Sequence, residues 1–91
     1  MKTLSARRYW ISGRVQGVGF RAFAARAARE TGVTGWAKNL ADGRVEVHAN
    51  GSSDQLSEFE ARLRQGPAWA DIRGFESQAA AVLDARGFNI G

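Results

Sequence analysis

In the first part of the chain, the spacing of apolar residues changes from every second residue, as in a strand, to every third or fourth residue, as in a helix. Residues 7–15 alternate apolar and polar side chains, with Tyr9 and Ile11 on one face, which predicts a half-buried strand. Residues 20–28 place apolar side chains at i, i+3, i+4, i+7 and i+8, the stripe of an amphipathic helix, and Gly32 is a suitable C-terminal cap. A strand followed by a helix is therefore expected here.

A hairpin is predicted after this helix. Residues 36–40 are strand-like, and Asp42 with Gly43 is a turn signal. Residues 45–50 then alternate again, with valines on one face and polar side chains on the other. Since His48 alternates with the core valines, we expect it to be an exposed strand residue.

The second half of the chain predicts one more helix and two more strands. Ser52 and Gln55 have the spacing of a capping box, and the apolar stripe that follows runs to a break at Gly66. Residues 72–81 are strand-like, and residues 88–90 are expected to form a last short strand. The main elements thus follow in the order βαββαβ.

This order predicts an α+β fold in which an antiparallel sheet carries two helices on one face, and residues 1–91 are expected to form a single domain. Right-handed crossovers make the first two strands run the same way, with the third between them. The loop after the first strand should then lie about 10 Å from Asn39, at the end of the second, because two interstrand spacings separate them. A small ligand fits between them.

The amino-acid composition limits which kinds of functional site this protein can have. Ninety-one residues, 44% of them hydrophobic and one of them proline, are enough for one packed domain. Zero cysteines and one histidine exclude thiolate zinc sites, thiol nucleophiles and histidine metal clusters. We expect neither a metal nor a cofactor. No apolar stretch is long enough for a membrane span, and we expect a cytoplasmic protein. The formal net charge of +4 favours anionic ligands.

Residues 17–21, Gly-Val-Gly-Phe-Arg, form a candidate anion site. They lie where a strand changes into a helix, so that glycine flexibility allows backbone N–H groups to turn inward beside the positive end of the helix dipole. Arg21 is unfavourable in a first helical turn unless an anion is bound, and its planar fork matches two phosphate oxygens. The alternative is a tight turn with a solvent-facing arginine.

Three other nucleotide-related interpretations fit less well. Gly17, Gly19 and Ala22 have the spacing of a dinucleotide fingerprint with Asp42 downstream, but that motif works in a parallel sheet too large for this chain. A Walker-type loop is excluded because Gly-Lys-Ser/Thr is missing. An RNA-recognition domain has the same element order, but its third strand displays aromatic side chains, and residues 44–48 contain none.

Two stretches closely resemble the signatures of the acylphosphatase family: GRVQGVGFR at residues 13–21 and GWAKNLADGRVE at residues 35–46. The resemblance extends over residues 8–90. It implies a ferredoxin-like α/β sandwich that hydrolyses the carboxyl–phosphate bond of acyl phosphates. Two departures concern Ala41, where the family often has proline, and Gly91, where it commonly has a basic residue and an aromatic one.

The resemblance also assigns roles. Arg21 matches the phosphate-binding arginine of the family, and Asn39 matches its water-orienting asparagine. It implies a metal-independent monomer that acts on a small acyl phosphate, releases inorganic phosphate, and binds neither nucleic acid nor membrane. The phosphate-binding residues that it implies are Gln16, Gly17, Val18, Gly19, Phe20 and Arg21.

Two further hypotheses accompany this one. A non-catalytic anion-binding or regulatory module on the same fold is the alternative function, although the presence of Asn39 beside Arg21 favours catalysis, because binding alone does not need both. In the absence of ligand, the carboxylate of Gly91 is a candidate partner for Arg21 if the last strand returns toward that edge of the sheet.

Overall fold

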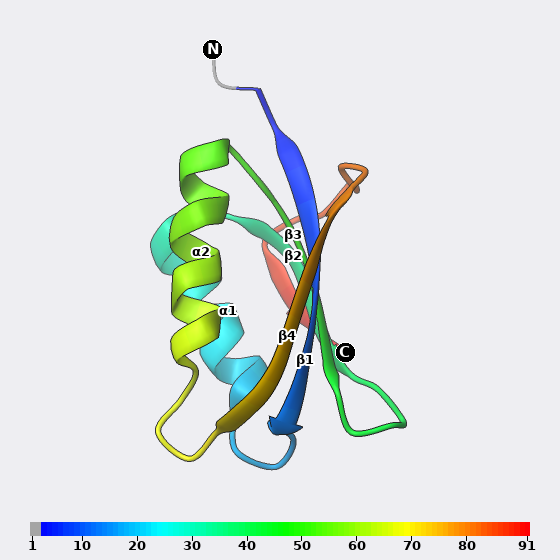
Figure 1. Ribbon diagram of the computed structural model, residues 1–91. Coiled ribbons are helices and arrows are strands. Elements are labelled where there is room, and N and C mark those ends of the chain that lie inside the picture. The colour runs from blue at the N-terminus through cyan, green and yellow to red at the C-terminus, as the bar shows by residue number, and fades with distance from the viewer. Residues whose placement is uncertain (1–2) are drawn as a thin grey trace.

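Strands and helices form two layers in the computed structural model, which describes residues 3–91 (Figure 1). Residues 1–2 of the predicted domain lie outside the described part. Both helices cover one face of the sheet, as the sequence predicts. The elements are β1 (Ser5–Arg14), α1 (Phe20–Thr31), β2 (Thr34–Asn39), β3 (Val45–Gly51), α2 (Ser53–Gln65), β4 (Asp71–Ala80) and β5 (Phe88–Ile90).

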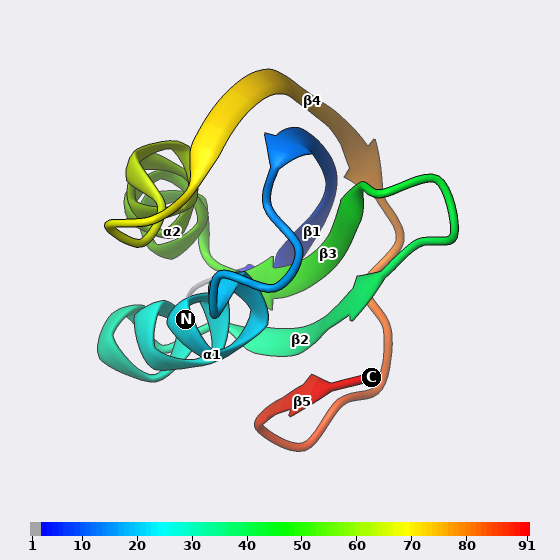
Figure 2. The same cartoon turned by 90° about the horizontal axis from the view of Figure 1, so that it is seen from below.

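The sheet has the strand order β4-β1-β3-β2-β5. β3 lies between β1 and β2 and is antiparallel to both, so β1 and β2 run the same way, as the crossover rule predicts. β5 pairs with β2 in parallel, which makes the sheet mixed and corrects the expectation of an antiparallel sheet. The reason is the connector, residues 81–87, which crosses to the opposite edge of the sheet and also reverses the chain direction (Figure 2). The fold is a ferredoxin-like α/β sandwich with one added edge strand.

The core lies between the sheet and the helices and follows the predicted periodicities. α1 ends at Gly32, which adopts a left-handed conformation and donates its N–H to the Ala28 carbonyl. α2 begins with the predicted capping box between Ser52 and Gln55. The largest fully buried apolar or aromatic side chains are Tyr9, Ile11, Val15, Phe20, Val45, Val47, Phe59 and Leu63.

His48 is wholly buried, at 0% exposure, and the prediction of an exposed strand residue is wrong. Its side chain does lie on the face of the sheet away from the helices, as the alternation indicates. Trp36 covers it there with a stacked ring, at 5.8 Å between centroids, and Arg8 Nη2 lies 3.3 Å from its Nδ1 atom. Periodicity identifies the face of a strand, whereas neighbouring strands decide whether that face is covered.

Tyr9 places a phenol hydroxyl inside the core. Its ring packs against Phe59 and Phe75, and its hydroxyl has no hydrogen-bond partner among the described residues. Burial above all, and then the nearby Glu60 carboxylate, together raise the pKa of the phenol from 10 to about 12, against the opposing effect of two arginines. The folded protein therefore retains this proton at pH values where the unfolded chain loses it.

We expect the free energy of unfolding of the wild type to fall as the pH rises from about 10 toward 12, because only the unfolded chain ionises Tyr9 in that range. Tyr9→Phe should remove this part of the pH dependence. At pH 7 the variant should be as stable as the wild type or more stable by about 1–2 kcal/mol, because it no longer buries an unpartnered hydroxyl. Urea unfolding of both proteins at pH 7 and pH 11 measures this. A Tyr9→Phe protein that loses as much stability as the wild type between these pH values would contradict it.

Candidate active site

The loop between β1 and α1 has the backbone of an anion-binding concavity. Gly17 and Gly19 have φ angles of 74° and 80°, while no described non-glycine residue has a positive φ. This alternation across residues 17–20 turns successive N–H groups toward the same side. Gly19 is the N-cap of α1 and offers no side chain to its first amides. The amides at the start of α1 are thus left without a side-chain cap.

A cavity of about 190 Å³ opens at this loop. It joins the start of α1 to the end of β2 and to β5, so it brings the Arg21 and Asn39 positions to one site, as the topology predicts. Of the predicted cradle, Gln16 and Val18 do not line the cavity. Ile90, which sequence reasoning missed, does. The lining residues are Val15, Gly17, Gly19, Phe20, Arg21, Ala22, Asn39 and Ile90.

Arg21 meets the end of the described chain. Its Nη1 atom donates a hydrogen bond to an oxygen of Gly91 at 2.5 Å. The Gly91 N–H in turn donates to the carbonyl of Ala37 in β2, at 2.8 Å. The contact hypothesised from the sequence between Arg21 and Gly91 is therefore present. Since a guanidinium has five N–H groups, donors of Arg21 are left for a ligand in the cavity.

Asn39 and its neighbour Lys38 point to opposite faces of β2. Asn39 shares the helix-covered face with Ala37 and lines the cavity. Lys38 lies on the uncovered face, where its Nζ atom is 3.4 Å from Glu46 Oε1 and 4.9 Å from the centre of the Trp36 ring. Of these two adjacent residues, only Asn39 therefore lines the candidate site.

Gln16 connects the two halves of the site through its side chain. Its Nε2 atom donates to the carbonyls of Leu40, at 2.8 Å, and Arg44, at 3.0 Å, which flank the turn after β2. This cross-link joins the β1–α1 loop to the turn that directly follows Asn39. Sequence reasoning assigned only the backbone of Gln16 to the site, because spacing does not show which distant carbonyls a side chain reaches.

Gln16→Ala should lower the free energy of unfolding by about 1–3 kcal/mol, because two hydrogen bonds are lost and each carbonyl keeps only its backbone donor. It should also reduce kcat by about tenfold, since small misplacements of reacting groups are costly. Thermal unfolding and steady-state kinetics measure the two effects. Gln16→Glu is the sharper variant, because its carboxylate faces two carbonyl oxygens. A folded Gln16→Ala protein with unchanged kcat would show that the cross-link does not align the site.

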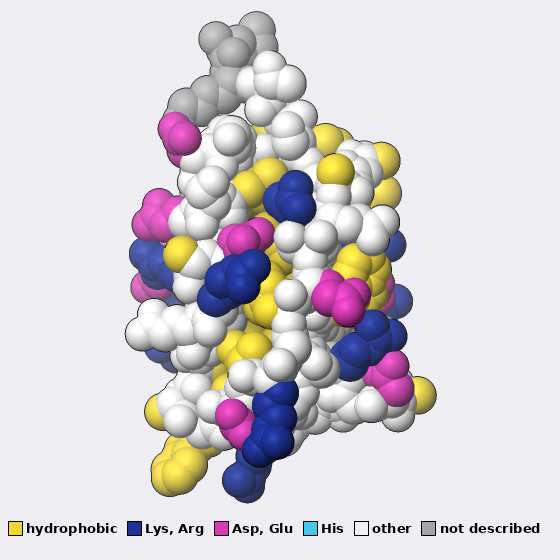
Figure 3. Space-filling model, viewed as in Figure 1, with side chains coloured by type: hydrophobic (Ala, Val, Ile, Leu, Met, Phe, Trp, Pro, Cys, Tyr) yellow, Lys and Arg dark blue, Asp and Glu magenta, His cyan; other side chains and the backbone are white. Residues whose placement is uncertain are grey.

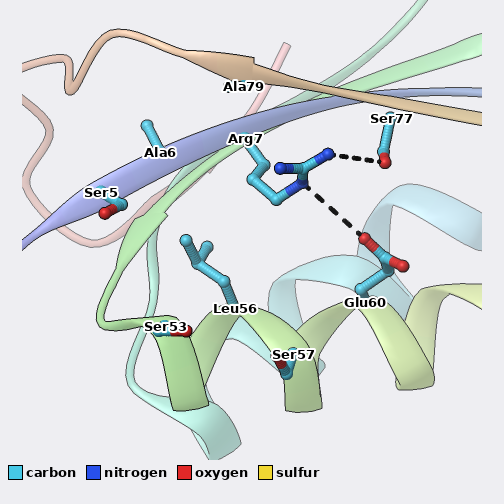
Figure 4. Close-up of a pocket in the computed structure, with 9 residues that line it drawn as sticks. All are labelled: Ser5, Ala6, Arg7, Ser53, Leu56, Ser57, Glu60, Ser77 and Ala79. Carbon is cyan, nitrogen blue, oxygen red and sulfur yellow. Dashed lines mark hydrogen bonds and ion pairs between the residues drawn. The ribbon is translucent and has the colours of Figure 1, made fainter.

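A larger cavity lies elsewhere, between α2, β1 and β4 (Figure 4), and its volume is about 590 Å³. Arg7 bridges it, with Nη2 donating to Ser77 at 3.0 Å and Nε 4.0 Å from Glu60. Neither Arg21 nor Asn39 lines it. On this side of the molecule cations and anions are interspersed, with apolar side chains visible between α2 and β4 (Figure 3). The smaller cavity, which Arg21 and Asn39 line, is therefore the better candidate for the active site.

Among residues 3–91, no group of three or more His, Cys, Asp or Glu side chains is arranged to hold a metal ion. No helix in the same part of the chain is long and apolar enough to cross a membrane.

The fold and the site define a class: a ferredoxin-like α/β sandwich with a glycine-rich loop between its first strand and first helix. A model of the acylphosphatase family matches residues 7–90. An acylphosphatase of Solibacter usitatus is 54% identical over 85 residues, which cover 93% of this chain and 88% of that protein. The chain belongs to the acylphosphatase family, hydrolases that act on acyl phosphates.

Solved structures agree with this assignment. An acylphosphatase from Coxiella burnetii has a TM-score of 0.91 and 33% identity, with 97% of this chain and 93% of that chain covered. An acylphosphatase from Bacillus subtilis has the same TM-score and identity, with 98% and 99% covered. These similarities confirm the ferredoxin-like fold predicted from the sequence.

Proposed function

We propose that this protein is a metal-independent acylphosphatase that hydrolyses acyl phosphates to a carboxylate and inorganic phosphate. The observation that carries the proposal is the cavity that Arg21, the glycine loop and Asn39 line together. Family membership supports the reaction class. Binding of an anion alone would not need a carboxamide facing the cradle, so the arrangement favours catalysis over a regulatory anion-binding module.

The phosphoryl group is bound by Arg21 and by the backbone amides of residues 16–20. The planar guanidinium donates to two phosphate oxygens, and the inward N–H groups of the loop donate to the others. These donors are fixed before substrate arrives, so they stabilise the charge on the transferring group without reorganising. They supply the positive charge that phosphoryl transfer needs, with no requirement for a metal ion.

Asn39 orients the attacking water. Its side-chain carbonyl accepts a hydrogen bond from the water and aims the oxygen at phosphorus, whereas its amide has no proton that titrates near pH 7. The water proton passes to a phosphate oxygen of the substrate. Because a carboxylate is a good leaving group, its departure needs no general acid. Positioning and charge stabilisation then account for the catalysis.

The remaining features of the proposal concern the protein as a whole. Residues 1–91 form one domain that acts as a monomer in the cytoplasm on a small-molecule substrate, without nucleic acid or membrane. Continuous burial between the two layers supports the single domain. Size-exclusion chromatography with light scattering tests the monomer, and a peak of twice the mass would contradict it.

Benzoyl phosphate is the substrate that tests the proposed reaction. Its loss, followed by ultraviolet absorbance, should be catalysed by the purified protein and should be insensitive to EDTA. p-Nitrophenyl phosphate, which has a poorer leaving group, should not be hydrolysed at a comparable rate. Loss of benzoyl phosphatase activity on EDTA treatment, restored by a divalent ion, would overturn the metal-independent scheme. Absence of hydrolysis would overturn the proposed function itself.

A further inference from the structure

The connector, residues 81–87, is bound to the sheet at two points: its Gly87 carbonyl accepts from the Gly35 N–H of β2 at 3.0 Å, and Leu83 is held by one side chain, that of Asn50 in β3. Asn50 Nδ2 donates to the Leu83 carbonyl at 2.9 Å, and the Leu83 N–H donates to Asn50 Oδ1 at 3.0 Å. The side-chain amide thus pairs with the backbone of Leu83 as a neighbouring strand would. Among the described residues, no other side chain forms a hydrogen bond with the connector, most of which is exposed.

Asn50 is 3% exposed, and all of its hydrogen-bonding capacity is used. Besides the pair with Leu83, its Oδ1 atom lies 2.9 Å from His48 Nε2, and its Nδ2 atom donates to Thr34 Oγ1 at 3.2 Å. Two bonds at the oxygen and two at the nitrogen satisfy a side-chain amide completely. Any rotation of the Asn50 side-chain amide would therefore break several buried hydrogen bonds.

The Leu83 N–H also fixes the direction of the hydrogen bond between Asn50 and His48. This donor requires an acceptor, so the atom of Asn50 that faces it must be oxygen. The same oxygen can only accept from His48, so Nε2 carries the proton and Nδ1 is left as the acceptor that faces Arg8 Nη2. An ordered series of hydrogen bonds, beginning at Arg8 and ending at Leu83, thus holds the Asn50 amide in one orientation.

The anchored connector leads directly into the candidate site. β5 follows it and is only three residues long, so its pairing with β2 provides few hydrogen bonds of its own. Ile90 at the end of β5 lines the cavity, and Gly91 accepts the hydrogen bond from Arg21. Anchoring Leu83 shortens the free segment before β5, which lowers the entropic cost of docking this strand.

We propose that Asn50 is a positioning residue for the reaction: by holding Leu83 it docks β5, and docking of β5 brings the next residue, Gly91, to the Arg21 guanidinium. The inference rests on the proposed role of Arg21 in binding phosphate. Without the anchor, Arg21 is less often held at the cavity before substrate arrives. Bound phosphate itself then orients the Arg21 side chain. The position of Asn39, on β2, does not depend on the connector.

Asn50→Ala should therefore raise KM for benzoyl phosphate and the inhibition constant of inorganic phosphate by about fivefold each, with kcat within about twofold of the wild type, because the loss is one of uniform binding. Hydrogen exchange of the Gly91 amide, which is bonded to Ala37, should become faster. The matched control is Ser52→Ala, which removes the cap of α2 and costs about 1 kcal/mol of stability but does not touch the connector. It should leave both constants and the Gly91 amide unchanged.

Leu83→Pro is a second variant that leaves in place the side chains of His48, Asn50 and Thr34 and the hydrogen bonds among them. It removes the N–H that bonds to Asn50 in an exposed segment, so folding of the core is not at risk, and it should raise the same two constants. Unchanged constants in either folded variant would overturn the role of Asn50, as would an equal rise in Ser52→Ala. A wild-type protein that neither binds phosphate nor hydrolyses benzoyl phosphate would instead overturn the proposed function, so the two failures are distinguishable.

Discussion

Replacing Arg21 with Gln is expected to abolish both phosphate binding and turnover. Arg21 carries the one guanidinium that lines the cavity, and no other cationic side chain lines it among the described residues. An arginine that stabilises a transferring phosphoryl group contributes about 10³ or more to the rate, so kcat/KM should fall by at least about a thousandfold. Inhibition by inorganic phosphate should disappear as well, because ground-state binding uses the same group.

Two controls accompany Arg21→Gln. Arg26→Gln removes the same charge from an exposed position of α1 outside the cavity, and it should leave kcat/KM within about twofold. Arg21→Lys keeps the charge but loses the planar fork, so its activity should lie between those of Arg21→Gln and the wild type. An Arg21→Gln protein that retained a tenth of the wild-type kcat/KM would contradict the assigned role.

Asn39→Ala is expected to abolish turnover but to spare phosphate binding. Asn39 lines the cavity from β2, whereas the proposed phosphate donors belong to Arg21 and the β1–α1 loop, so its removal leaves those donors in place. Loss of an oriented water should lower kcat by about 10² or more, since positioning of the nucleophile accounts for much of the acceleration. The two variants thus separate binding of the anion from activation of the water.

Isothermal titration with inorganic phosphate and steady-state kinetics with benzoyl phosphate distinguish these outcomes. Lys38→Ala is the matched control for Asn39→Ala, because it truncates the adjacent residue of the same strand on the opposite face. Its kcat should be close to that of the wild type. If Asn39→Ala kept most of its kcat, or if it lost phosphate binding as completely as Arg21→Gln, the water-orienting role would be wrong.

Local signals in the sequence were sufficient for most of the fold. The capping box at Ser52 and the glycine at position 32 mark helix ends because cap geometry depends on a few neighbouring residues. The alternation around Tyr9 and around Val47 identifies the buried face of each strand for the same reason. The handedness of crossovers then places the β1–α1 loop near Asn39 without any knowledge of side-chain contacts.

That Arg21 and Asn39 line one cavity could be predicted from the sequence, but the contacts that support this cavity could not. The positions of Arg21 and Asn39 follow from motif and topology. The cross-link from Gln16 to the turn after β2 does not, because it joins a side chain to carbonyls 24 and 28 residues away. Ile90 reaches the cavity only because β5 pairs in parallel with β2, and three residues of sequence do not specify which strand they join.

The sequence by itself determined the elements, their order, the core face of each strand and the segment that carries the chemistry, since these depend on period, caps and chain connectivity. The tertiary structure alone decided that His48 is buried, that the connector is held by Asn50, and that Gly91 meets Arg21. Each of these depends on segments that are distant in the chain and adjacent in space. Local patterning places a polar side chain on a face, but only the packed fold decides what covers that face and which groups satisfy its hydrogen bonds.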